Sequence, residues 1–356
     1  MKLVEEKGLR LHAAPDAAFH PSVARMSALR DAVRRERPDL LHVWDWWQCL
    51  EAYYAVYLPM RVPMVVTDMM MELTRVLPRT LPTTFGTPEI VDQARAAGRR
   101  RAELLMPAVD VELNSPGAAD PQPFRERHGI RRGEITLVTV SRLSEWLKSE
   151  SLLRTVDAVR TLGRDLPLRF VIVGDGMVRP RLERLANEVN AELGRPAVVL
   201  AGALVDPRPA YAAADIVVGM GSSALRGMAF GKPVVIVGGQ GFSAPLTPAT
   251  ADTFYYTGIY GRGDDSPGNA RLVADIRGLA ERSDQLTALG DFSRQFVVRH
   301  FSLETVGARL AEYCADAVAD VPARHVAVAD GLRTAAVYLR ERRFWVPSRD
   351  PVPSQS

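Results

Sequence analysis

The chain is of ordinary globular size and composition, and its charges nearly balance. Its 356 residues favour two domains, and 47% hydrophobic against 24% charged residues allows a sizeable core. With 45 basic and 42 acidic residues, the net charge of +3 does not argue for nucleic acid or an anionic membrane as a partner. We therefore expect no nucleic-acid partner.

The cysteines and the first residues indicate a reducing compartment. Cys49 and Cys314 stand far apart, without a CxxC or Cys/His cluster, which excludes a cysteine-based zinc site. Residues 1–7 carry charges throughout and lack an apolar leader, and no run of about 18 apolar residues occurs. We expect a cytoplasmic protein that is neither secreted nor membrane-spanning.

In the first half, short apolar runs alternate with amphipathic ones less regularly than further along the chain. Strands are predicted at 38–43 and 62–67, with a helix at 49–58 between them. A Pro, Gly and Asn cluster at 114–123 is typical of a linker, and we place the domain boundary near Gly133. Residues 1–132 are thus predicted to form a first, shortened Rossmann-like domain.

The second half has the βαβα rhythm of a parallel sheet covered by helices on both faces. Strands are predicted at 135–140, 168–173, 198–200, 216–218 and 234–237, and helices at 151–162 and 181–193. This doubly wound domain is expected over 133–320. A C-terminal helix within 321–345 is expected to pack back on the first domain, followed by a Pro- and Ser-rich tail at 346–356.

Two features of the second half point to a bound anion. Small residues follow the strand at 216–218, so the backbone N–H groups of Gly221, Ser222 and Ser223 should point outward from a helix N-terminus, which favours phosphate. Arg142 follows the strand at 135–140, and Lys148 opens the next helix. Because ligands of parallel sheets lie at the carboxyl ends of the strands, both cations should face the same crevice and neutralise a diphosphate. The alternative is that both are solvated surface residues.

A Gly-Asp-Gly turn follows the strand at 168–173. Gly174 tolerates a positive φ and lets a nucleotide approach the backbone closely. A plain turn explains the same residues equally well.

The order of several motifs resembles glycosyltransferase family 4. The resemblance covers residues 133–316 well and 38–110 loosely. It is carried by Val140-Ser141-Arg142-Leu143 with Lys148, Val173-Gly174-Asp175-Gly176, Ala201-Gly202, Tyr211 with Ala214-Asp215, Ala229-Phe230-Gly231-Lys232-Pro233-Val234-Val235, and Arg294 with His300-Phe301-Ser302.

The resemblance implies the GT-B fold, two Rossmann-like domains facing a cleft, and a retaining transferase that uses a nucleotide diphosphate sugar. It implies that Arg142 and Lys148 hold the donor diphosphate and stabilise the departing nucleotide, a role suited to fixed cations. Leu204 and Val205 fall where the family encloses the nucleotide base, with plain core packing as the alternative. No metal is called for, and no cofactor beyond the donor.

One departure from the family pattern concerns two glutamates. The second normally contacts the ribose hydroxyls, but here Arg226 takes its place, and the shortened stretch 215–226 removes the first. A guanidinium only donates hydrogen bonds, so it cannot accept them from a diol. Arg226 suits an extra phosphate, a carboxylated sugar or a different nucleotide; the alternative is an arginine turned to solvent.

The other departure is at the beginning of the chain. No strand with a glycine-rich loop precedes residues 8–12, and Asp68 stands where a histidine often follows a strand. About two strands and their helices are expected to be missing. Either the gene product is longer, or a partner covers the gap, or the chain is a shortened, inactive relative.

Aromatic and basic runs in the first half bear on the acceptor. Trp44, Trp46, Trp47, Tyr53, Tyr54 and Tyr57 follow the first strand and suit either an acceptor sugar or lipid portion, or the core. Arg95 and residues 99–101 suit either acidic head groups at a membrane face or a solvated helix face. The acceptor, which is a small molecule, a glycan or a lipid-linked compound, stays open.

The leading hypothesis is a retaining glycosyltransferase. A catalytically impaired member that binds nucleotide sugars as a partner or regulatory subunit is the second, and a nucleotide-sugar epimerase is the third. The sequence does not identify the donor sugar, its base or the oligomeric state.

Overall fold

The computed structural model describes residues 7–265 and 268–341, and the chain divides into two compact units. Unit 1 comprises Met1–Leu105 with Ala308–Ser356, and unit 2 comprises Met106–Gly307. This division differs from the expected boundary near Gly133, because the linker region packs with unit 2. There, α6 (Gln122–Arg127) lies on α9 (Arg208–Ala213), and Arg125 donates to the carbonyl of Ala213 at 2.8 Å. The predicted tail at 346–356 lies outside the described residues.

Unit 2 is built on a six-stranded sheet of order β10-β9-β8-β5-β6-β7, parallel except for the edge strand β10. Three predicted strands have the expected bounds, and the other two extend one or two residues further than expected. The strands are β5 (Ile135–Val140), β6 (Leu168–Val173), β7 (Val198–Gly202), β8 (Ile216–Gly219), β9 (Val234–Val237) and β10 (Ser243–Pro245).

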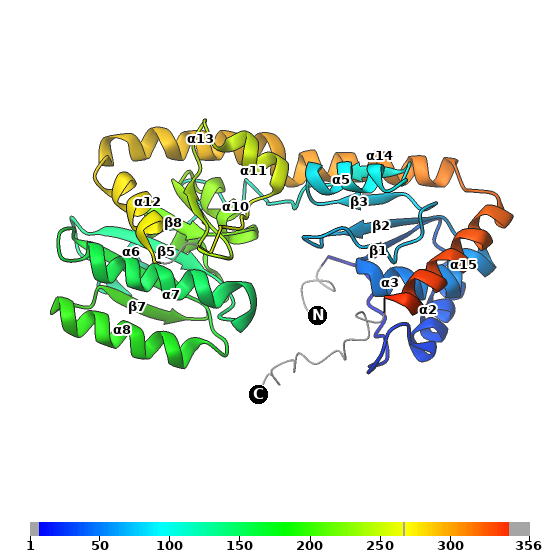
Figure 1. Cartoon of the computed structure of the whole chain (residues 1–356), viewed down its shortest axis with the longest axis horizontal. Coiled ribbons are helices and arrows are strands. Elements are labelled where there is room, and N and C mark those ends of the chain that lie inside the picture. Colours follow the sequence, from blue (N-terminus) through cyan, green and yellow to red (C-terminus); the bar gives the residue numbers. More distant parts are fainter. Residues whose placement is uncertain (1–6, 266–267, 342–356) are drawn as a thin grey trace. The chain divides into compact units, whose positions relative to one another are not determined.

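Along the chain, the helices of unit 2 alternate with the strands up to β9, and further helices follow one another after β10 (Figure 1). Helix α7 packs against α8 and α12, whereas α10 packs against α13. Besides α6 and α9, the helices are α7 (Glu145–Leu162), α8 (Arg179–Leu193), α10 (Ser222–Ala229), α11 (Ala251–Thr257), α12 (Ala270–Ala280), α13 (Ser283–Phe301) and the start of α14 (Leu303–Ala319).

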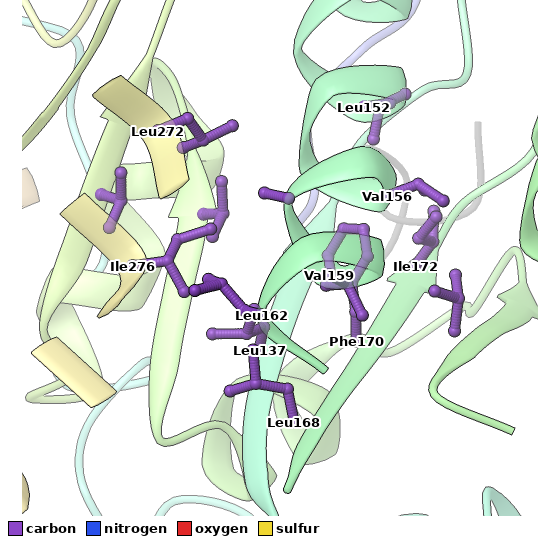
Figure 2. Packing of buried hydrophobic residues seen from close by; sticks show 14 of the residues in the cluster. Leu137, Leu152, Val156, Val159, Leu162, Leu168, Phe170, Ile172, Leu272 and Ile276 are labelled. Atoms are coloured by element: carbon purple, nitrogen blue, oxygen red, sulfur yellow. The ribbon is translucent and has the colours of Figure 1, made fainter. Parts of the chain in front are cut away.

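The main core of unit 2 lies between the sheet and the layer of α7, α8 and α12. Leu152, Val156 and Val159 recur at helical spacing on α7 and are buried against Phe170 of β6 and Ile276 of α12 (Figure 2). This packing fixes α7 on the sheet, and with it the helix start that carries Lys148.

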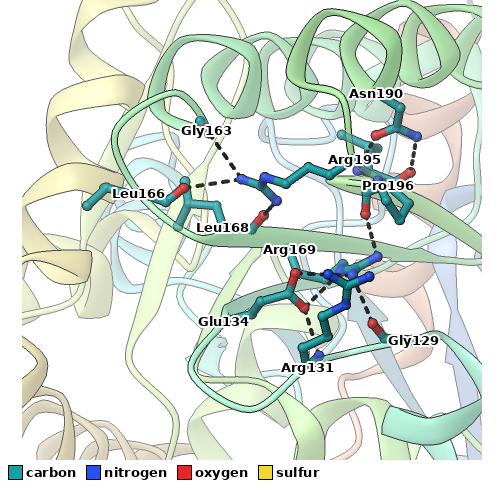
Figure 3. A network of polar contacts seen from close by, with 11 residues as sticks. Gly129, Arg131, Glu134, Gly163, Leu166, Leu168, Arg169, Asn190, Arg195 and Pro196 are labelled. Carbon is teal, nitrogen blue, oxygen red and sulfur yellow. Dashed lines mark hydrogen bonds and ion pairs between the residues drawn. The ribbon is translucent and has the colours of Figure 1, made fainter.

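A buried arginine lies at the amino ends of the strands of unit 2. Arg169 of β6 is 2% exposed, and its guanidinium donates to both carboxylate oxygens of Glu134 and to the carbonyls of Gly129 and Pro196 (Figure 3). Each of the three guanidinium nitrogens therefore donates at least one hydrogen bond, which compensates the buried charge. This network lies at the edge of the sheet opposite to the carboxyl ends of the strands.

Unit 1 contains a smaller parallel sheet of order β1-β2-β3-β4, which agrees with the two strands predicted there and adds two short ones. Its strands are β1 (Leu41–Trp44), β2 (Met64–Asp68), β3 (Thr83–Phe85) and β4 (Ala102–Leu104). Its helices are α2 (Val23–Glu36), α3 (Asp45–Ala52), the π-helix η1 (Tyr53–Tyr57), α4 (Leu58–Met60), α5 (Pro88–Ala96), the rest of α14 and α15 (Arg324–Arg340).

The aromatic run of unit 1 belongs mainly to its core. Tyr53 and Tyr57 are 0% and 1% exposed, and the Tyr53 hydroxyl donates to the carbonyl of Ala327 on α15 at 2.6 Å. The Tyr54 hydroxyl donates likewise to Gly331 at 2.8 Å. Acceptor binding is therefore wrong for the buried Tyr53 and Tyr57, and the hydroxyls of Tyr53 and Tyr54 hold the C-terminal helix within unit 1.

The arginine run of unit 1 is structural only in part. Arg99 is 4% exposed, and its guanidinium donates to the carbonyls of Leu77 and Pro78 at 2.7 and 2.8 Å. Arg95 donates to the carbonyl of Ala102, and Arg101 to that of Asp320. The solvated face is therefore wrong for Arg99, whereas Arg95 and Arg100 are exposed and agree with it.

Candidate functional site

The strand order of unit 2 places a switch point between β5 and β8. From β5 the chain proceeds outward through β6 and β7 in one direction, and then returns to β8 and β9 on the other side. The two central strands pair directly, with Leu137 opposite Ile216 and Val138 opposite Val217. In open α/β sheets, the connections leaving such neighbouring strands diverge and form a ligand-binding crevice at their carboxyl ends.

A small pocket lies at these carboxyl ends. Lys148 of α7 and Ser223 of α10 both line it, over a floor from the last residues of β5 and β8. The remaining lining residues are Thr139, Ser141, Ser151, Leu152, Thr155, Val218, Gly219, Met220 and Val237. The structure therefore brings one predicted cation and the predicted helix start to the same pocket.

Arg142 and Lys148 lie close enough for their charges to interact. Arg142 is exposed in the loop between β5 and α7, and Lys148 is half-buried in the first turn of α7. Burial, and then the positive charge of Arg142, lower the pKa of Lys148 to about 8. Among the described residues, no carboxylate shifts the pKa of Lys148, so these two cations form a site that favours an anion.

The start of α10 differs from the prediction at one of its three amides. The Gly221 N–H donates to the carbonyl of Ile259 at 2.8 Å, so this amide does not point to a ligand. Leu225 makes the first helical hydrogen bond, to Gly221, which leaves the amides of Ser222 and Ser223 without a helical acceptor. Gly221 instead provides the positive φ of 55° at which the chain turns into the helix.

Gly174 is likewise required for packing, and its amide is occupied. Its φ is +140°, and a Cβ at this position would lie 1.8 Å from the carbonyl oxygen of Ser141. Its N–H donates to the carbonyl of Gly202 at 2.8 Å. Gly174 therefore fixes the loop that carries Arg142, and the close approach of a nucleotide to its backbone stays a prediction.

The residues predicted to enclose a base follow β7. Val205 is fully exposed at 108% relative accessibility, and Leu204 is half-buried. The alternative of core packing is wrong for Val205, because a core side chain is not left in solvent. Base contact by Leu204 and Val205 stays a prediction.

Arg226 lies on the exposed face of α10, four residues after the exposed Ser222. Within residues 7–265 and 268–341, its guanidinium makes no hydrogen bond or ion pair. The Tyr211 hydroxyl of α9 donates at 3.4 Å to Ser223, which lines the pocket, and Tyr211 also lies within range of the charge of Arg226.

Sequence reasoning did not select the side chains that join β5 to β8 and α10. The Thr139 hydroxyl donates to the carbonyl of Val218 at 2.7 Å, and Tyr211 holds Ser223. A threonine near the end of a largely apolar strand was the available signal for Thr139. No local signal pairs Tyr211 with Ser223, because two separate helices bring them together.

Comparison with protein families identifies the segment that forms this pocket. Residues 134–252 match the family model described as Glycosyl transferases group 1. Every residue predicted to bind the donor lies inside this matched segment. The resemblance to a glycosyltransferase, predicted from the order of motifs, is thus confirmed, while family 4 in particular stays a prediction. No curated protein matches the sequence.

Solved structures share the fold over most of the chain. A glycosyltransferase from Rickettsia africae has a TM-score of 0.71 and 14% identity, over 90% of this chain and 88% of its own. Anabaena HepE, solved with UDP, has a TM-score of 0.67 and 16% identity, over 88% of each chain. Sucrose-phosphate synthase from Thermosynechococcus elongatus has a TM-score of 0.62 and 16% identity, over 81% of this chain and 76% of its own. At these identities the likeness shows the fold alone, and it confirms the predicted GT-B class.

Membrane spans and metal ligands are the two remaining features of the described residues. No helix between residues 7 and 341, apart from the two residues left out at 266–267, is both long and apolar enough to cross a membrane. In the same part of the chain, no group of three or more His, Cys, Asp or Glu side chains is arranged to hold a metal ion.

Proposed function

We propose that this protein transfers a glycosyl group from a nucleoside diphosphate sugar to an acceptor, with retention of configuration. The observation that carries the proposal is the pocket at the switch point of the glycosyltransferase segment. There, Lys148 and the start of α10 converge, with Arg142 beside Lys148. HepE, which shares the fold, was solved with UDP and with UDP-glucose.

In the proposed reaction, the diphosphate lies against the amides of Ser222 and Ser223 and between the two cations. Breaking the glycosidic bond leaves additional negative charge on the departing nucleoside diphosphate. Fixed donors that are already in place stabilise that charge better than water, which must reorganise. Arg142 and Lys148 supply these donors, and retention of configuration rests on the resemblance to retaining transferases.

The test is a donor-turnover assay on the full chain and on matched arginine variants. Arg142→Ala removes the proposed diphosphate contact, whereas Arg164→Ala removes an exposed arginine at the other end of α7. We expect Arg142→Ala to lower kcat/KM by about 100-fold or more and Arg164→Ala to leave it unchanged. Equal turnover in both variants contradicts the assignment.

A second function is favoured by Arg226, which stands where related transferases use a glutamate. A chain that binds nucleotide sugars without turning them over serves as a partner or regulatory subunit. Calorimetry and the turnover assay together separate these proposals. Binding without transfer or hydrolysis, in the presence of an acceptor panel, favours the subunit.

A further inference from the structure

Arg226 is an arginine of unit 2 to which the described contacts assign no structural role. Its side chain is exposed, and among the described residues it has neither an ion pair nor a hydrogen bond that would explain it as a structural element. By contrast, Arg125, Arg169 and Arg195 of the same unit each donate to backbone carbonyls. The position of Arg226 relative to the pocket therefore needs an explanation.

The geometry of α10 directs Arg226 toward the pocket. Side chains on an α-helix lean toward its N-terminus, and residues four apart share a face. Arg226 consequently leans back over the turn that begins at Ser222, where the unbonded amides lie. Its Cα lies one turn, about 6 Å, further along the helix than that of Ser222, so its guanidinium reaches a point beside the amides rather than between them.

A chain of contacts connects Arg226 to the two other cations. Lys148 and Ser223 line the same pocket, and the Tyr211 hydroxyl donates to Ser223. Burial raises the pKa of Tyr211, while the Ser223 hydrogen bond and the charge of Arg226 oppose that rise. Arg226 thus lies on the α9 side of Ser223, whereas Lys148 reaches the pocket from α7.

Two further carboxylates of unit 2 follow the strands β6 and β7. Asp175, after β6, pairs with Arg179 at 3.2 Å, and Asp206, after β7, pairs with Arg208 at 2.6 Å. Each carboxylate is therefore occupied by an arginine of its own loop or helix. The diphosphate of a nucleotide sugar is matched by Arg142 and Lys148, which leaves the charge of Arg226 available.

We propose that Arg226 selects a donor that carries an anionic group in addition to its diphosphate. This inference rests on the proposed function and deepens it by naming the class of donor. The additional anion is either a carboxylate on the transferred sugar or a phosphate on the nucleoside. Both offer the oxygen acceptors that a planar guanidinium binds with two parallel hydrogen bonds.

The experiment compares matched pairs of donors by calorimetry on the full chain. UDP-glucuronate against UDP-glucose and GDP-mannuronate against GDP-mannose test the sugar carboxylate. UDP with and without a 3′-phosphate, and GDP likewise, test the nucleoside phosphate. The variants are Arg226→Gln, which removes the charge, Arg226→Lys, which keeps it, and Arg164→Gln as an exposed control on the same unit.

We expect wild type to bind the more anionic member of one pair at least about tenfold more tightly. Arg226→Gln abolishes that preference without weakening the neutral member, Arg226→Lys keeps part of it, and Arg164→Gln keeps all of it. The pair that shows the preference identifies the source of the anion. Thermal unfolding of each variant checks that the exposed substitutions leave the fold intact.

Two results overturn the inference, and they are distinguishable. Tight binding of neutral and anionic members alike, unchanged in Arg226→Gln, contradicts the role of Arg226 but leaves the proposed transferase function standing. Absence of binding by every nucleotide in the panel contradicts the proposed function, and the role of Arg226 falls with it.

Discussion

Lys148 of α7 and Ser223 of α10 line one pocket at the carboxyl ends of the paired strands β5 and β8. The segments that follow β5 and β8 meet there, because the chain leaves β5 toward one side of the sheet and leaves β8 toward the other. The segment after β5 brings two cations, and the segment after β8 brings the amides of a helix start. Their convergence is the structural basis for the proposed diphosphate site.

The first prediction concerns the pH dependence of donor binding. Burial and Arg142 lower the pKa of Lys148 to about 8, so Lys148 loses its positive charge as the pH rises through that value. Donor affinity should therefore be constant below the pKa and fall above it, by up to about tenfold for each pH unit. Calorimetry between about pH 7 and about pH 9.5 measures this. Lys148→Arg, whose guanidinium stays charged, should flatten the profile; a decline of equal size in Lys148→Arg contradicts the assignment.

The second prediction separates the two cations. Because the charge of Arg142 lowers the pKa of Lys148, Arg142→Ala should raise that pKa toward the ordinary lysine value. The variant should bind donor more weakly near neutral pH, yet the pH at which affinity begins to fall should move upward. Arg164→Ala should change neither quantity. A weaker affinity without any shift of the profile would show that Arg142 and Lys148 do not interact.

The third prediction concerns the loop that positions Arg142. Gly174→Ala places a Cβ 1.8 Å from the Ser141 carbonyl at a φ of +140°, so one of the two loops must move. We expect the free energy of unfolding to fall by about 3 kcal/mol. Gly278→Ala, in α12 with open space around it, is the matched control and should stabilise the protein by about 0.5 kcal/mol. Urea unfolding of both variants measures these changes in the free energy of unfolding. An equal change in the two variants would contradict the close approach of Gly174 to the Ser141 carbonyl.

The fourth prediction concerns unit 1. Asp68 ends β2 at 1% exposure, its Oδ1 accepts from the Met70 N–H at 3.2 Å, and burial raises its pKa above the ordinary 3.8. An acid whose pKa is raised by folding destabilises the folded state once the pH exceeds its unfolded pKa, because ionisation is then favoured in the unfolded chain. Asp68→Asn should therefore raise the melting temperature near neutral pH and have little effect near pH 3, where both states are protonated. Asp39→Asn, at an exposed site of unit 1, should change neither; a loss of stability at neutral pH in Asp68→Asn would show that the carboxylate charge is needed.

The sheet of unit 2 could be predicted closely, and the short strands of unit 1 could not. Strand β9 is a continuous apolar run that is buried throughout, and β5 is apolar apart from two threonines and buried except at its ends, so hydrophobicity marks their limits. Strands β3 and β4 have three residues each, too few to show a period. Helix α7 begins at Glu145, ahead of the apolar repeat that starts near Leu152, because its first turn is polar and half-exposed.

The candidate site was predictable in its location but not in its hydrogen bonds. A helix start after an apolar strand and two cations after another strand are visible in sequence, and the parallel fold brings them together. The occupied amides of Gly174 and Gly221 were not predictable, because their acceptors, Gly202 at the end of β7 and Ile259 after α11, lie far along the chain. The arginine at 99 illustrates the same limit, since only the fold shows that carbonyls enclose it.

The most direct test of the account is a crystal structure of the full chain with a bound nucleoside diphosphate. We predict that its phosphate oxygens lie within hydrogen-bond distance of the amides of Ser222 and Ser223 and of Lys148 Nζ, with Arg142 beside the terminal phosphate. A nucleotide bound elsewhere on the molecule, with the pocket between β5 and β8 empty, would contradict the account.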